Sequence, residues 1–241
     1  MEENINDNNN INVFLKLYSK FKFSSPVILI FTFFLCVLTI VTIFKVKGLE
    51  SEENNEINTI SSPVGDVKIQ KGNLPNVFIV TFSDGTTYEG QFNQNGIPHG
   101  RGKYRFSDGG SFDGELKKGI THGYGISILS DGSRYEGQFI EGRVEGQGVE
   151  KLTDGSRYEG GWKNDKYHGQ GIKILSNGTK YVGQFREGLF HGKGSLILTD
   201  GTQYDGSWIK GNLQNDVIVT YPDGNRKEIE EIHLSQIYNP S

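Results

Sequence analysis

An aromatic position that returns at almost constant spacing constrains the fold of this chain more than any other feature. It falls at Tyr88, Phe112, Tyr135, Tyr158, Tyr181 and Tyr204, so the intervals are 24, 23, 23, 23 and 23 residues. Glycine is dense over the same stretch, but it lacks the Gly-x-y period of collagen. A fixed period of this length is typical of repeat proteins, in which each unit buries its apolar face against neighbouring units.

Each unit has the pattern of two β-strands. In the first strand Tyr88, Gly90 and Phe92 alternate with polar residues, which places the aromatics and the glycine on one face. The second strand carries two glycines and then a large apolar residue, which is Phe106 in the first unit. Later units have Leu129, Leu152, Leu175 and Leu198 in its place. We therefore predict that an aromatic ring lies over backbone without a Cβ, so that strands approach closely. The predicted structural positions are Tyr88, Gly90, Phe92, Gly100, Gly102, Tyr135, Gly137, Phe139, Tyr158, Gly160, Trp162, Tyr181, Gly183, Phe185, Tyr204, Gly206 and Trp208.

Asp-Gly or Asn-Gly pairs separate the apolar strands. They are Asp84-Gly85, Asp108-Gly109, Asp131-Gly132, Asp154-Gly155, Asn177-Gly178, Asp200-Gly201 and Asp223-Gly224. Glycine adopts positive φ at little cost, and Asp and Asn tolerate it, so these pairs predict tight hairpin turns. The first pair follows an apolar run that ends at Phe82, and it predicts a half-unit that caps the first hairpin.

The order Tyr-x-Gly-x-Phe, His-Gly-x-Gly and Asp-Gly at 23-residue intervals resembles the MORN repeat (membrane occupation and recognition nexus). The resemblance covers Val77 to about Arg226 and implies an all-β fold. The implied architecture is an elongated antiparallel sheet of stacked β-hairpins, with six units and an N-terminal half-unit. Two departures stand out: Glu145 replaces the histidine of the other units, and the last unit reads LQNDVIV where His-Gly-x-Gly is expected. Loss of the glycines in a last copy is typical of a terminal cap.

Composition divides the rest of the chain into further segments. Residues 1–25 are Asn-rich and are predicted to be a disordered tail. Residues 45–75 have the composition of a linker, 76–226 are the repeat array, and 227–241 are a C-terminal cap or tail. Residues 26–44 carry no charge and would span roughly 28 Å as a helix, which predicts one N-terminal transmembrane helix. A buried core helix and a cleavable signal peptide are the alternatives for this segment.

The lysines around residues 26–44 predict an orientation. Lys16, Lys20 and Lys22 precede the segment, whereas Lys45 and Lys47 follow it. The excess on the N-terminal side favours a cytoplasmic N-terminus, which would place the repeats on the opposite side of the membrane. The sequence thus predicts a single-pass membrane protein.

Catalytic, cofactor and metal sites are not indicated by the sequence. His99, His122, His168 and His191 occur one per unit, whereas zinc ligands must converge on one point. The Asp-Gly pairs lack the alternating acids of a calcium loop. No Gly-x-Ser-x-Gly elbow is present, and Cys36, the lone cysteine, lies in the apolar segment. Residues 88–226 hold equal numbers of basic and acidic residues, which argues against a nucleic-acid partner.

These observations predict a non-catalytic, membrane-anchored scaffold that presents an extended β-surface to an unidentified protein partner. The predicted partner-binding face is an acidic stripe: Glu89, Asp113, Glu115, Glu136, Glu159 and Asp205. The alternative is a module that binds phospholipid head groups, although the zero net charge of the array disfavours anionic lipid. The resemblance also implies a third function, accessory to a phosphatidylinositol phosphate kinase activity, because MORN arrays occur joined to such kinases and to a histone methyltransferase. In both cases catalysis belongs to a separate domain, so we predict that the chain is not an enzyme.

Overall fold

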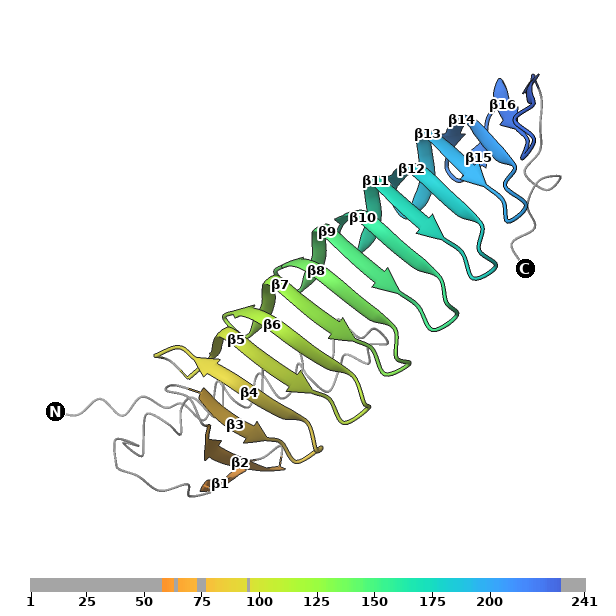
Figure 1. Ribbon diagram of the computed structural model, residues 1–241. Coiled ribbons are helices and arrows are strands. Elements are labelled where there is room, and N and C mark those ends of the chain that lie inside the picture. The colour runs from red at the N-terminus through yellow and green to blue at the C-terminus, as the bar shows by residue number, and fades with distance from the viewer. Residues whose placement is uncertain (1–57, 63–64, 73–76, 95, 231–241) are drawn as a thin grey trace, which may run out of the picture.

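A computed structural model describes residues 58–62, 65–72, 77–94 and 96–230. Within these residues the chain forms one 17-stranded antiparallel sheet, in which successive hairpins stack side by side along an elongated body (Figure 1). Each strand from β1 to β14 pairs with the next strand in the chain, β14 pairs with both β15 and β16, and β16 pairs with β17. Among the described strands β1 pairs only with β2 and β17 only with β16, so the sheet is open rather than closed into a barrel. The strands are β1 Asn58–Ser62, β2 Gly65–Lys71, β3 Val77–Thr81, β4 Thr87–Phe92, β5 Pro98–Arg105, β6 Ser111–Lys117, β7 Ile120–Ile128, β8 Arg134–Ile140, β9 Arg143–Lys151, β10 Arg157–Lys163, β11 Lys166–Ile174, β12 Lys180–Arg186, β13 Leu189–Ile197, β14 Gln203–Ile209, β15 Asn212–Leu213, β16 Val217–Thr220 and β17 Arg226–Ile229.

The aromatic face of the sheet, called the inner face below, is the hydrophobic core. The side chains of Tyr88, Tyr158, Tyr181 and Trp208 are all at most 1% exposed. Neighbouring rings meet edge to face, as in the pair Tyr158 and Trp162, whose centroids lie 5.4 Å apart. The core therefore follows the repeat from one hairpin to the next, as the alternation predicts.

Glycine is required opposite these rings because a Cβ would collide with them. A Cβ on Gly171 would lie 2.6 Å from the Tyr158 Oη atom and 2.8 Å from two further ring atoms. A Cβ on Gly160 would lie 2.5 Å from the Cα of Gly171, its partner on the adjacent strand. Rings therefore lie over bare backbone in the first five units, which explains why the glycines recur with the aromatics. In the sixth unit a Cβ on Gly206 would meet Leu213 rather than Tyr204.

The two glycines of the His-Gly-x-Gly motif have different roles. Gly169, the first, has φ +71° and open space around its Cβ position, whereas Gly171, the second, lies under the tyrosine ring. The pairing of β10 with β11 shifts register between Gly160 and Trp162, so the first glycine lies in a β-bulge. The bulge turns the end of the hairpin over the inner face, and Tyr167 stacks on Tyr158 with centroids 3.8 Å apart.

The Asp-Gly pairs form hairpin turns along one edge of the sheet, as predicted, but the aspartate has another role than the one predicted. At the second pair the Gly109 N–H donates to the Phe106 carbonyl, and Gly109 has φ +93°. This is a type I turn followed by a glycine bulge, in which only the glycine has positive φ. The aspartate instead accepts a hydrogen bond from the backbone two residues on; the Asp108 Oδ1 atom lies 2.9 Å from the Gly110 nitrogen.

The opposite edge carries turns that sequence analysis did not single out. At Lys118-Gly119 both residues have positive φ, 53° and 79°, and the flanking Lys117 and Ile120 pair directly. These values define a two-residue type I′ turn. The later units repeat it at Glu141-Gly142, Asn164-Asp165, Glu187-Gly188 and Lys210-Gly211. The first unit, which is one residue longer, has a wider loop between Phe92 and Pro98.

The prediction of a single-pass membrane protein is wrong. In the part of the chain that the structure describes, no helix is long and apolar enough to cross a bilayer. All of the described elements are strands, so the transmembrane helix is not part of the observed fold class. Residues 26–44, on which that prediction and its orientation rested, lie outside the described residues, as do residues 1–25.

The sheet extends beyond both ends of the predicted array. Strands β1 and β2 fall within residues 45–75, which the sequence analysis treats as a linker. Strand β3 ends before Asp84-Gly85 and pairs with β4, so it completes the first hairpin as the half-unit predicts. Strand β17 begins at Arg226 and pairs with β16, so the sheet continues into the segment predicted as a C-terminal cap or tail.

Candidate interaction surface

The face opposite the aromatic core, called the outer face, is built from residues that alternate with the buried ones. Strand pairing aligns these residues in rows that run across the strands, along the length of the array. The first outer row consists of Glu89, Lys103, Asp113, Ile126, Glu136, Val149, Glu159, Ile172, Val182, Ser195 and Asp205. The second outer row consists of Thr87, Arg105, Ser111, Ile128, Arg134, Lys151, Arg157, Ile174, Lys180, Ile197 and Gln203.

The predicted acidic residues are mostly brought together by this geometry. Five of the six stand in the first outer row, where residues of the second strands separate them. Glu115 lies apart, opposite Arg101, and its carboxylate fills the space beside Gly123. The stripe is therefore a row in which aliphatic residues, Lys103 and Ser195 separate the acids, rather than a continuous run of acids.

Ion pairs link the two outer rows. Within β8 the Arg134 Nη2 atom lies 2.5 Å from Glu136 Oε2, and within β10 Arg157 Nη2 lies 2.6 Å from Glu159 Oε2. Glu136 also accepts a hydrogen bond of 2.8 Å from the Tyr124 hydroxyl. This hydrogen bond and the Arg134 guanidinium lower the pKa of the Glu136 carboxyl. The first row is acidic and the second basic, so the outer face carries charge of both signs in fixed order.

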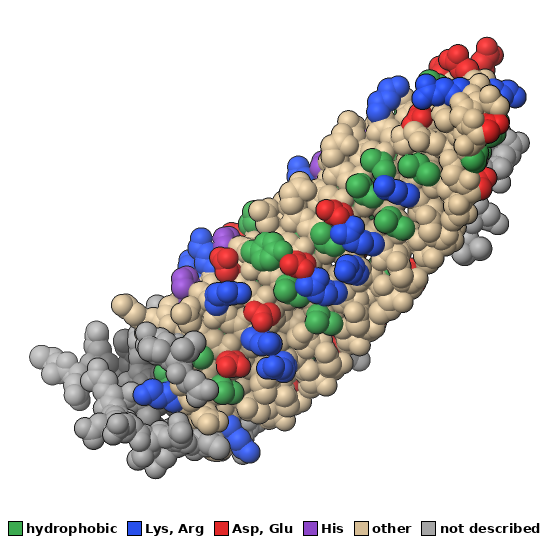
Figure 2. Space-filling view, in the orientation of Figure 1, with side chains coloured by type: hydrophobic (Ala, Val, Ile, Leu, Met, Phe, Trp, Pro, Cys, Tyr) green, Lys and Arg blue, Asp and Glu red, His purple; other side chains and the backbone are tan. Residues whose placement is uncertain are grey.

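Aliphatic side chains interrupt both rows. Ile172 pairs with Val182 across strands, and Ile174 follows Ile172 on the same face of β11. Val182 and Ile128 are exposed, at 36% and 37%. Figure 2 shows hydrophobic side chains on the visible face, interspersed with basic and acidic ones. A sheet face with β-branched residues among ordered charges offers both apolar area and directional contacts to another protein.

A polar cluster lies on the inner face, and sequence analysis missed it. Glu150 and Lys173 are the cross-strand neighbours of Tyr158. The corresponding residue is Tyr104 in the first unit and Leu196 in the fifth. The Tyr167 hydroxyl donates to Glu150, and the Lys173 Nζ atom lies 5.0 Å from the Tyr167 ring centroid. Burial lowers the pKa of Lys173, whereas burial and Glu150 raise that of Tyr167.

The cluster had a signal in the sequence. Glu150 and Lys173 share the repeat offset of Tyr104, Ser127 and Leu196, and an ionisable residue at an offset that faces the core marks a polar contact. Within the described residues no three His, Cys, Asp or Glu side chains gather as a metal site. The inner cluster therefore joins hairpins through a hydroxyl, a carboxylate and an ammonium group.

Five consecutive segments match the family model of the MORN repeat: residues 88–111, 112–134, 135–157, 158–180 and 181–203. The chain is a MORN-repeat protein. The sixth unit, which starts at Tyr204 and lacks His-Gly-x-Gly, is present in the structure as β14 to β16 although the family model stops before it.

Comparisons beyond the MORN family model add little. No curated protein matches the chain. Among solved structures, the TCP domain of SAS-4 (dCPAP) from Drosophila melanogaster, in complex with a proline-rich motif of Ana2 (dSTIL), is 8% identical with a TM-score of 0.42; the match covers 76% of this chain and 95% of that one. The TCP10 domain of Danio rerio CPAP, in complex with a STIL peptide, is 14% identical with a TM-score of 0.37, and the match covers 73% and 84%. At these values neither protein's partner is carried over to this chain.

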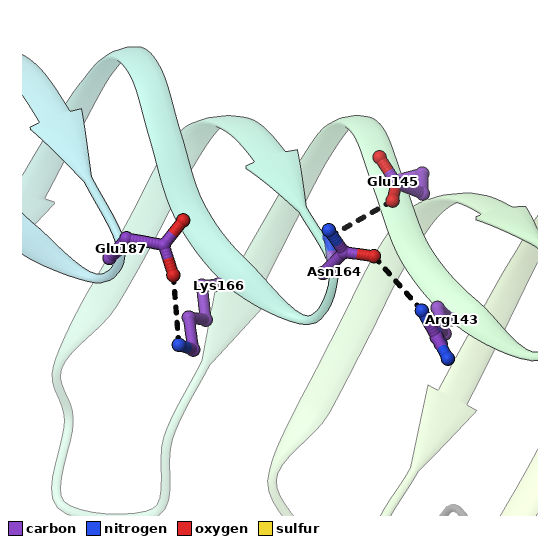
Figure 3. A network of polar contacts seen from close by, with 5 residues as sticks. All are labelled: Arg143, Glu145, Asn164, Lys166 and Glu187. Atoms are coloured by element: carbon purple, nitrogen blue, oxygen red, sulfur yellow. Dashed lines mark hydrogen bonds and ion pairs between the residues drawn. The ribbon is translucent and has the colours of Figure 1, made fainter.

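The tips of the MORN hairpins contact one another at the type I′ turns (Figure 3). Asn164 accepts a hydrogen bond of 3.1 Å from Arg143, and its backbone N–H donates to Glu145 over 2.9 Å. One unit further on, the Lys166 Nζ atom lies 2.9 Å from Glu187 Oε2. Glu145, the departure from the histidine of the other repeats, therefore binds the next tip.

The turns at the two long edges of the MORN array differ in charge. The edge with Asp-Gly turns carries Asp84, Asp108, Asp131, Asp154, Asp200 and Asp223. The opposite edge, called the tip edge, carries Lys117, Lys118, Lys163, Arg186 and Lys210, which are in no ion pair within the described part of the chain. Histidine and basic side chains lie together along the upper left edge in Figure 2. The tip edge also carries Glu141, Glu145, Asp165 and Glu187, so its charge is mixed with an excess of basic residues, whereas the charged residues of the Asp-Gly pairs are all acidic.

Proposed function

We propose that the chain is a non-catalytic MORN scaffold that binds a protein partner through its outer face. The observation that supports this most is the regular order of the outer rows, in which half-exposed aliphatic residues alternate with paired charges. The sheet places these side chains on a rigid backbone, so little conformational freedom is lost when a partner binds. The five acidic residues of the first outer row belong to this surface, together with the basic residues beside them.

Proximity labelling with the full chain in cells tests the proposal. The variant Ile172→Ser with Val182→Ser removes apolar contact area from the outer face. The control Ile140→Ser with Ile209→Ser removes aliphatic residues that are 52% and 51% exposed at the tip edge. We expect the outer-face variant to lose labelled proteins that the control retains. Equal labelling by the wild type and both variants would exclude the outer face as the binding surface.

Binding of phospholipid head groups is a second candidate function, which the unpaired cations of the tip edge favour. Basic residues near an anionic surface contribute on the order of 1 kcal/mol each. Flotation of the full chain with vesicles that contain phosphatidylserine tests this candidate. Lys117→Gln, Lys118→Gln and Lys163→Gln together should reduce flotation, whereas Lys103→Gln, Lys151→Gln and Lys180→Gln together should not. Flotation that is equal for both triple variants would exclude the tip edge as a lipid site.

A further inference from the structure

The outer rows are complementary to each other, which has a consequence for the partner of the outer face. We infer that this partner is a second copy of the chain, packed sheet against sheet with the two arrays parallel. The inference rests on the proposed function, since it identifies the protein that the outer face binds. The argument follows from symmetry, charge and the order of apolar residues along the rows.

Symmetry decides which row faces which. A two-fold axis that lies between the sheets and runs along the array places the first outer row of one copy over the second outer row of the other. An axis that runs along the strands instead places each row over itself. Two-fold contacts are isologous, so every residue contact occurs twice. The first arrangement sets the acidic row against the basic row, whereas the second sets each row against itself and gives the acidic residues no basic row to face.

The charged residues match strand by strand in the parallel arrangement. On β8, Glu136 of one copy faces Arg134 of the other, and on β10 Glu159 faces Arg157. In the free chain these residues form the ion pairs within each strand. In the dimer the carboxylates of Glu136 and Glu159 each lie between two guanidinium groups, one from each copy. The ion pairs of β8 and β10 thus become networks in which opposite charges face each other across the interface.

The isoleucines of β7 and β11 match in the same register. On β7, Ile126 faces Ile128 of the other copy, and on β11 Ile172 faces Ile174. Aligned sheets pack about 10 Å apart at an angle of roughly 30°, because each sheet is twisted, so contact is closest in the middle of the array. The matched strands β7, β8, β10 and β11 are central in the array, whereas β9 between them sets Val149 against Lys151. The mismatch of Lys103 over Arg105 falls on β5, towards one end, where the sheets diverge.

Charge reversal in one row at a time gives a test that misfolding cannot imitate. Variant one carries Glu136→Arg and Glu159→Arg, and variant two carries Arg134→Glu and Arg157→Glu. Each variant alone sets like charges against like across the interface, so we expect its dimerisation to weaken by about tenfold or more. Mixed together, the two variants restore opposite charges at every position, and we expect a heterodimer with affinity close to that of the wild type.

Sedimentation of the purified full chain over a range of concentrations measures these affinities. A wild-type chain that is monomeric throughout, or dimers that both variants leave unchanged, would overturn the inference. Two variants that fail to pair with each other would overturn it as well. If the chain is monomeric while the outer-face variant of the labelling experiment still loses its labelled proteins, the proposed function stands with a different partner.

Discussion

The hydroxyl oxygen of Tyr158 lies 2.6 Å from the point at which a Cβ on Gly171 would stand. The same hydroxyl donates a hydrogen bond of 2.8 Å to the carbonyl of Gly161. The ring is therefore fixed between a backbone acceptor at its end and a bare backbone beneath its face. Tyr88, Tyr135 and Tyr181 repeat both contacts, with Gly102, Gly148 and Gly194 beneath their rings, so the relationship recurs in four of the six units.

The buried tyrosines predict a loss of stability in alkaline solution. Burial raises the pKa of Tyr181 from 10.0 to about 12, and it raises the pKa of Tyr88, Tyr135 and Tyr158 further. Below pH 10 these phenols are neutral in both the folded and the unfolded chain, so their contribution to stability is complete. Above pH 10 the unfolded chain loses phenolic protons that the folded chain keeps, and the free energy of unfolding falls with pH.

Denaturant unfolding at pH 8, 9, 10 and 11 measures this dependence, with tryptophan fluorescence as the signal. We expect an unfolding midpoint that is nearly constant to about pH 10 and falls above it. A midpoint that is unchanged at pH 11 would contradict the burial of the phenols.

The hydrogen bonds of the turn aspartates predict that two substitutions of Asp131 lower the free energy of unfolding by different amounts. Its Oδ1 atom accepts a hydrogen bond of 2.8 Å from the Ser133 nitrogen, and Asn177 makes the equivalent bond to Thr179 at 2.9 Å. Asp131→Ala removes the acceptor, so we expect the free energy of unfolding to fall by about 1 kcal/mol. Asp131→Asn keeps the acceptor and should change it by less than half as much. Equal losses in the two variants would show that the hydrogen bond does not stabilise the turn.

Asp165 has two structural roles in its type I′ turn: it adopts positive φ, and its side chain accepts a hydrogen bond. It has φ 62°, and its Oδ1 atom lies 2.7 Å from the Val144 nitrogen. Asp165→Ala loses both the acceptor and the tolerance of positive φ, so we expect a loss of about 2 kcal/mol in thermal or denaturant unfolding. Asp165→Asn retains both properties and should be nearly neutral, and Asp165→Gly should fall between them. A glycine variant as unstable as the alanine variant would contradict the role of the backbone angle.

Period and alternation were enough to predict the sheet, the hairpins and the aromatic core. Tyr158 and Gly160 share a face because side chains alternate along a strand, and a 23-residue spacing stacks each such pair on the next. The sequence also predicted the acidic residues of one outer row correctly as side chains that face away from the core. These results depend on local geometry, which a pattern encodes directly.

The remaining features depend on pairing register, which no single strand encodes. The sequence shows that Arg157 and Glu159 share one face of a strand. It does not show that Val149 and Ile172 lie opposite Glu159 on the neighbouring strands, which is what separates the acidic residues of the row. The bulge at Gly169 shifts the register within the hairpin, and it brings Tyr167 onto Tyr158. Because of the same shift, Gly169 lies in the bulge, whereas Gly171 lies under the ring of Tyr158.

The seating of rings on bare backbone is tested most directly by a double-mutant cycle between Tyr158 and Gly171, with the fluorescence of the adjacent Trp162 as the unfolding signal. Gly171→Ala should lower the free energy of unfolding by about 2 kcal/mol in the wild type, because its Cβ meets the tyrosine ring. In a Tyr158→Leu background the same change should cost little, whereas the control Gly169→Ala should cost the same in both backgrounds. A Gly171→Ala penalty that is independent of the residue at position 158 would contradict the account.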